Sequence, residues 1–155
     1  MIDPLIVKTL HIFGAMVIFG TGMGTAFHGL MCNLSGDLRS MVTGNRNVVI
    51  ADWIFTTPAV ILQPITGFYL MWANGWSLDD HWIVASIILY IIAGGCWLPV
   101  VWLQVRMHRM SEMALETNSE LPSIYKRYFR IWFLLGWPAF ISGGAILWLM
   151  VSKPF

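Results

Sequence analysis

The sequence predicts an all-α integral membrane protein: a four-transmembrane-helix antiparallel bundle in up-down-up-down order. Of its 155 residues 57% are hydrophobic and only 11% are charged, whereas charged residues make up about a quarter of an ordinary soluble domain. Four apolar stretches each reach the roughly 20 residues that cross a hydrocarbon core about 30 Å thick. Short connections between them favour antiparallel neighbours, so we expect one domain that spans residues 1–155.

We expect the four helices at about residues 5–34, 48–73, 81–110 and 127–152. The first apolar run is longer than the apolar core of a cleaved signal peptide, which indicates that it stays as the first helix. The polar stretch "NLSGDLRSMVTGNRN" is expected to form a loop, and "NGWSLDD" a tight turn. The third helix is expected to continue beyond the membrane until Pro122 interrupts it.

Basic residues are distributed unevenly along the chain. They gather after the first and third apolar stretches, at Arg39, Arg46, Arg106, Arg109, Lys126, Arg127 and Arg130. The positive-inside rule then predicts a multi-pass protein of the bacterial inner membrane, with both termini on the periplasmic side. Topology and contact with lipid headgroups explain these charges, so the lipid bilayer is the expected partner and no nucleic acid is expected.

Small residues and prolines recur inside the spans. The first helix contains Gly14, Gly20, Gly24 and Gly29, of which Gly20 and Gly24 form a small-xxx-small pair, and these small residues predict close packing against a neighbour. Prolines occur within the spans at positions 58, 64, 99 and 138. Prolines inside a membrane helix release backbone carbonyls and favour kinks, so we expect them to open space within the bundle.

Polar side chains inside a span are functional candidates by default, because they are costly in lipid. Helical spacing places five small or polar residues on one stripe of the second helix, namely Asp52, Thr56, Ala59, Gln63 and Gly67. Depth along the helices predicts a polar layer near the cytoplasmic face, made of His28, Asp52, Gln104, Arg106 and Arg130. We expect Asp52 to pair with one of the arginines. Two roles stay open for this layer: structural register, or a function such as a proton path.

His11 is a more specific functional candidate, as a ligand of haem iron. It lies about one and a half turns into the first helix, on a face rich in small residues, and haem iron accepts a histidine nitrogen. Helix bundles hold such cofactors in their cores. We expect Gln63 to orient the histidine, and Met71 or Met150 are candidate second ligands. The alternative is a histidine that bonds only to a neighbouring carbonyl or to Gln63.

Ten methionines raise the further hypothesis of copper handling. In "MHRMSEM", Met107, His108 and Met110 gather, and thioether sulfur favours Cu(I). Methionine also serves as adaptable apolar filler. The sequence has no paired carboxylates, Ser-His-Asp arrangement, phosphate loop or zinc spacing, so it indicates no particular enzyme class.

The chain resembles a family of bacterial predicted integral membrane proteins that is classed as a domain of unknown function. The stretches that carry this resemblance are "LHIFGAMVIFGTGMGTAF", "ADWIFTTPAVILQPITGFYL", "GGCWLPVVWLQVRM" and "YKRYFRIWFLLGWPAFISGGAILWLMVSKPF". More remotely, "KTLHI", "YKRYFR" and the closing "KPF" are similar to the HemJ-type membrane protoporphyrinogen oxidases, which are four-helix haem-b proteins. That resemblance implies His11 as a haem ligand. The third helix departs from that family, because "HWIVAS" has no lysine and "GGCWLPVVWL" has no histidine.

The leading hypothesis is therefore a haem-b-binding redox protein with His11 as axial ligand, which works with a membrane redox partner or as a homo-oligomer. The alternative is a non-catalytic accessory subunit or small transporter that uses the layer of Asp52, Gln104 and Arg106. Copper handling is the third hypothesis.

Overall fold

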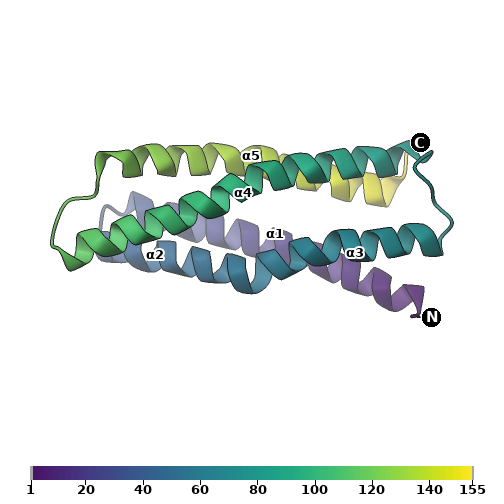
Figure 1. The fold of residues 1–155 in the computed structure, drawn as a ribbon, viewed down its shortest axis with the longest axis horizontal. Coiled ribbons are helices and arrows are strands. Elements are labelled where there is room, and N and C mark those ends of the chain that lie inside the picture. Colours follow the sequence, from purple (N-terminus) through teal and green to yellow (C-terminus); the bar gives the residue numbers. More distant parts are fainter. Residues whose placement is uncertain (1, 155) are drawn as a thin grey trace.

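The computed structural model describes residues 2–154 and consists of four long helical spans (Figure 1). The first is α1 (Pro4–Leu34), and the second is a continuous helix made of α2 (Leu38–Ala51), the π-helical segment η1 (Asp52–Thr56) and α3 (Thr57–Ala73). The third and fourth are α4 (His81–Glu116) and α5 (Ser123–Ser152). All four are long and apolar enough to cross a membrane, which confirms the predicted fold class.

Successive spans run antiparallel (Figure 1). The two ends of the chain lie at one end of the bundle with the α3–α4 connection, and we call this the terminal end. The α1–α2 and α4–α5 connections lie at the opposite end, which carries most of the arginines and is called the basic end. Helix α4 packs along α5, α1 packs along α2 and α3, and α2 packs against α4.

The second span begins at Leu38, well before the predicted start near residue 48, so most of the predicted loop is helix. The chain reverses at Gly36, whose φ of +73° suits glycine. Asp37 then caps the new helix, because its carboxylate accepts a hydrogen bond from the backbone N–H of Ser40 at 2.8 Å. Helix α4 continues to Glu116, and α5 begins directly after Pro122.

A π-helical turn interrupts the second span at η1. The backbone N–H of Thr57 donates to the carbonyl of Asp52, five residues earlier. This turn precedes Pro58, which has no N–H to continue the regular pattern. The wider turn leaves Asp52 and Thr56 on the same buried face, and π-turns of this kind recur at functional sites.

The predicted close packing of the glycines in the first helix is confirmed at Gly14 and Gly29, and it is wrong at Gly20 and Gly24, which face open space. One close contact lies at the basic end, where a Cβ on Gly44 would come within 2.5 Å of the Cys32 Cβ. At Gly29, a Cβ would lie 3.1 Å from Val48. Gly29 of α1 and Gly44 of α2 therefore allow these two helices to pack closely near their connection.

Two apolar clusters fill the interface of α4 and α5. One, toward the basic end, comprises Val100, Leu103, Met107, Tyr125 and Trp132. The other, toward the terminal end, comprises Trp82, Ile83 and Leu149. Large apolar side chains such as Phe13, Phe55 and Ile91 are exposed on the outside of the bundle, which is the distribution that a lipid environment favours.

Candidate functional site

His11 projects from α1 toward α3, where Thr66 holds its ring. The Nδ1 atom lies 2.7 Å from the Thr66 hydroxyl oxygen, and that hydroxyl donates its only hydrogen to the carbonyl of Leu62 at 2.7 Å. With that hydrogen committed to Leu62, the hydroxyl accepts from His11, and the hydrogen-bond geometry assigns the tautomer protonated at Nδ1. Consequently Nε2 carries the free lone pair, and the ring is only half-buried.

Small residues let this histidine sit close to α3. A Cβ on Gly67 would lie 3.4 Å from the Cε1 atom of His11. On α1, a Cβ on Gly14 would come within 2.5 Å of the Gln63 amide nitrogen. Both glycines therefore create room for the contacts between the two helices.

Gln63 contacts the histidine's backbone rather than its ring. Its amide nitrogen donates to the carbonyl of His11 at 2.8 Å. Gln63 therefore fixes the path of α1, and Thr66 orients the imidazole. The role of His11 and Gln63 toward a cofactor stays a prediction.

The two methionines that are candidate second haem ligands pack among apolar side chains. Met71 and Met150 pack against the apolar cluster of Trp82, Ile83 and Leu149. His81 is exposed at the start of α4. Within residues 2–154, no three His, Cys, Asp or Glu side chains gather as a metal-binding group. His11 therefore belongs to no such group.

The polar stripe of the second span faces inward, as predicted. Asp52, Thr56 and Ala59 are buried, and Gln63 and Gly67 are half-buried. The Thr56 hydroxyl donates to the Asp52 carboxylate at 2.9 Å, and the buried Gln104 of α4 approaches the same carboxylate. This part of the predicted polar layer is brought together.

The other three members of that layer point away from Asp52. His28, Arg106 and Arg130 are all exposed. His28 lies beside Asn47, with 3.4 Å between the imidazole Nε2 and the amide nitrogen. Arg106 is two residues beyond Gln104, which turns it about 200° around the helix. The expected pairing of Asp52 with an arginine is therefore not found, and the one ion pair within residues 2–154 joins His108 to Glu112.

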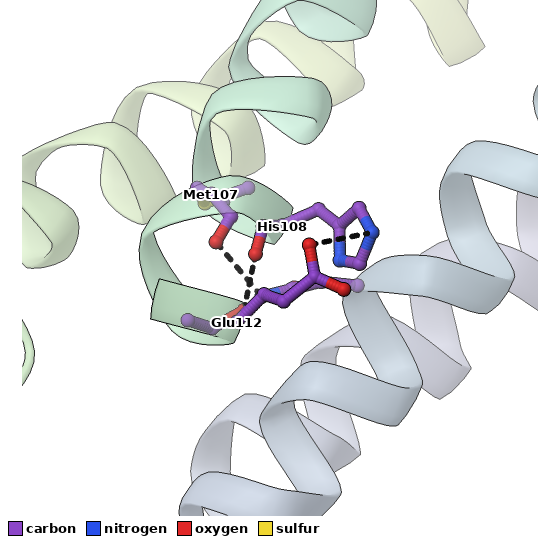
Figure 2. Close-up of polar contacts among 5 residues, drawn as sticks. Met107, His108 and Glu112 are labelled. Atoms are coloured by element: carbon purple, nitrogen blue, oxygen red, sulfur yellow. Dashed lines mark hydrogen bonds and ion pairs between the residues drawn. The ribbon is translucent and has the colours of Figure 1, made fainter. Parts of the chain in front are cut away.

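Figure 2 shows that pair on α4, beside the backbone carbonyls of Met107 and His108. The Nε2 atom of His108 lies 3.9 Å from the Glu112 carboxylate, whose side chain is half exposed. Met107, a candidate copper ligand, is only 3% exposed and belongs to the apolar cluster of α4 and α5.

A small cavity lies beside Gln104, toward the basic end. It encloses about 10 Å³ and is lined by Gly29, Asn33, Asn45, Val48, Gln104, Met107 and Trp132. The Gln104 Oε1 and Trp132 Nε1 atoms are buried and have no hydrogen-bond partner in the described part of the chain. One acceptor and one donor beside a space of about one water's size are the conditions under which an internal water binds.

A hydrogen-bonded network joins all four spans at the basic end, and the sequence analysis missed it. Its members are Asn33 of α1, Asn45 of α2, Ser111 of α4 and Tyr125 of α5. The Asn45 amide nitrogen contacts the Tyr125 hydroxyl at 2.8 Å and the Ser111 hydroxyl at 3.2 Å. The Asn33 amide donates to the Asn45 side-chain oxygen at 3.2 Å, and Tyr125 donates to Asn33.

Comparison with known families identifies a family to which the chain belongs. The model of the family described as "Predicted integral membrane protein (DUF2269)" matches residues 5–154, so the chain belongs to that family. No curated protein and no solved structure matches the chain. The resemblance to HemJ-type oxidases therefore stays a prediction.

Proposed function

We propose that this member of the DUF2269 family of integral membrane proteins binds haem b through Nε2 of His11 and serves as a membrane redox protein. The observation that carries the proposal is the hydrogen bond from His11 Nδ1 to Thr66, since that hydroxyl is already committed as a donor to Leu62. A histidine fixed in this way presents its unprotonated nitrogen to a metal, which is the usual arrangement of metal-ligating histidines.

The donor set around His11 suits haem better than a free metal ion. Imidazole nitrogen is a common axial ligand of haem iron, and one protein ligand is sufficient there. A free transition-metal ion would need several ligands, and no three-residue group of His, Cys, Asp or Glu occurs within residues 2–154. Haem would supply one-electron transfer, and a membrane redox partner or a second copy of the chain would exchange the electron.

We further propose that the basic end lies in the cytoplasm of a bacterium and that both termini lie outside the inner membrane. The distribution of basic residues supports this orientation, because seven of the nine Lys and Arg residues lie in the helix segments that flank the two connections at the basic end. Alkaline phosphatase fused after Phe155 is expected to be active. A fusion that is inactive although it is produced in full would reverse the orientation.

The test of the haem proposal is the absorption spectrum of protein purified from haem-replete cells. We expect a Soret band, and we expect His11→Ala to remove it while the protein stays folded and helical. His81→Ala is the matched control, because His81 is exposed at the start of α4 at the same end of the bundle. A colourless parent protein, or an equal Soret band in His11→Ala, would refute the proposal.

The buried carboxyl of Asp52 favours a second candidate function, a small transporter or accessory subunit that moves protons. Asp52 has no basic partner within 4.0 Å in the described residues, and Thr56 and Gln104 face it instead. Buried acids in membrane spans frequently mark proton paths. Vesicles that contain the parent protein should then take up protons under an imposed potential, and Asp52→Asn should abolish that uptake. Uptake no faster than in empty vesicles would exclude this candidate.

A further inference from the structure

A pocket opens at the basic end between α4, α5 and their connection, well away from His11 and Asp52. Its volume is about 460 Å³, within the usual range of roughly 300–1,000 Å³ for small-molecule sites. Its polar lining includes Arg106, Arg109, Ser119 and Tyr128, and its apolar lining includes Met110 and Met113. The pocket therefore combines two guanidinium groups with apolar surface.

The guanidinium of Arg106 is held in place by aromatic rings. It lies 5.3 Å from the centre of the Trp102 ring, and Trp102 in turn lies 5.6 Å from Tyr128. Stacking on an aromatic face suits the flat guanidinium and leaves its N–H groups free to donate. Arg106 is therefore positioned before any ligand binds.

Neither arginine of the pocket is neutralised by a carboxylate. The only ion pair within residues 2–154 is that of His108 with Glu112, so Arg106 and Arg109 have no acidic group within 4.0 Å. Glu120 is the one acidic residue in the lining. Two arginines against one glutamate leave the pocket with net positive charge.

The position of the pocket along α4 matches the depth of lipid phosphates. The apolar stretch of α4 ends at Val105, directly before Arg106. Phosphate groups of phospholipids lie just outside the hydrocarbon core, and basic pockets between membrane helices bind anionic headgroups there. Met113, which is 64% exposed, offers apolar surface beside the charges.

We infer that this pocket binds the phosphate of an anionic phospholipid, with Arg106 and Arg109 as its donors. Arginine pairs with phosphate through two parallel N–H···O bonds, and two arginines favour a headgroup that carries net negative charge over a zwitterionic one. Lipid tails then lie along the apolar outer faces of α4 and α5. The inference is independent of the proposed haem function.

The test compares lipid retained by the purified protein after exchange into detergent with equal amounts of phosphatidylglycerol and phosphatidylcholine. Native mass spectrometry is expected to show phosphatidylglycerol bound in at least tenfold excess over phosphatidylcholine. The double variant Arg106→Gln with Arg109→Gln is expected to retain at least tenfold less phosphatidylglycerol than the parent. The matched control is Lys126→Gln with Arg127→Gln, which removes two exposed positive charges outside the pocket lining and should retain the lipid.

Three outcomes would overturn the inference. Equal loss in both double variants would indicate general surface charge, and equal retention of the two lipids would exclude selection for an anion. Displacement of the lipid by millimolar inorganic phosphate would assign the pocket to a free anion instead. Arg106→Lys keeps the charge and removes the planar fork, so it should fold normally and bind several-fold more weakly even if the double variant does not fold.

Discussion

Asn45→Ala is expected to lower the free energy of unfolding by about 2–4 kcal/mol, because the interhelical hydrogen bonds of this side chain disappear together. Asn45 contacts Asn33, Ser111 and Tyr125, each on a different span. It is only 4% exposed, so water cannot readily replace it. Loss of one side chain would therefore loosen the contact among all four helices at the basic end.

Thermal unfolding in detergent, followed by circular dichroism, measures the effect. A loss of this size corresponds to a melting temperature lower by roughly 5–15 °C for a chain of this length. Asn47→Ala is the matched control, since Asn47 lies two residues along the same helix and is exposed, and its melting temperature should change by less than about 2 °C. Equal melting temperatures for the two variants would show that the network contributes nothing to stability.

Tyr125→Phe separates the network from the packing. The ring of Tyr125 belongs to the apolar cluster of α4 and α5, and phenylalanine keeps it. Only the hydroxyl contacts with Asn33 and Asn45 are lost. We therefore expect a smaller loss than in Asn45→Ala, about 1 kcal/mol, measured in the same unfolding experiment.

The helical spans and the inward face of the second span were predictable from the sequence, and the network was not. Composition and run length alone indicate four spans. The inward stripe follows from spacing, because Asp52, Thr56 and Ala59 are small or polar where lipid would favour large apolar side chains. Asn45 fell in a predicted loop, so its side chain was never considered as an interior group.

The missing signal lay in the spacing of the segment that forms α2. After the capping residue Asp37, the residues that turn inward follow helical spacing, namely Leu38, Met41, Val42, Asn45 and Val48. An asparagine on an otherwise apolar helical stripe predicts an interior partner. The strongly polar remainder of this segment gave it the composition of a loop and concealed the pattern.

The arginines of the predicted polar layer show the limit of depth as a criterion. Arg106 and Gln104 lie at nearly the same depth, and the rotation of about 200° between them places only Gln104 inside. Long basic side chains also reach outward to the headgroups while their stems contact apolar surface. Depth therefore identified which groups share a layer, and rotation around each helix decided which of them meet.

Thr66→Val is expected to weaken haem binding about 10–100-fold, which is the usual effect of removing the group that orients a metal-ligating histidine. Valine is β-branched like threonine and lacks the hydroxyl, so the packing of the buried Thr66 methyl group is kept while its hydrogen bonds are lost. The His11 ring then loses its partner at Nδ1, and both its tautomer and its orientation become free. Titration of the haem-free protein with haem, followed by the Soret band, gives the dissociation constant.

Thr57→Val, at a half-buried position nearer the middle of the same span, is the control and should bind haem as the parent does. Equal affinity in Thr66→Val would mean that the Thr66 hydroxyl does not orient the ligand, whereas complete loss together with a lowered melting temperature would assign Thr66 to folding.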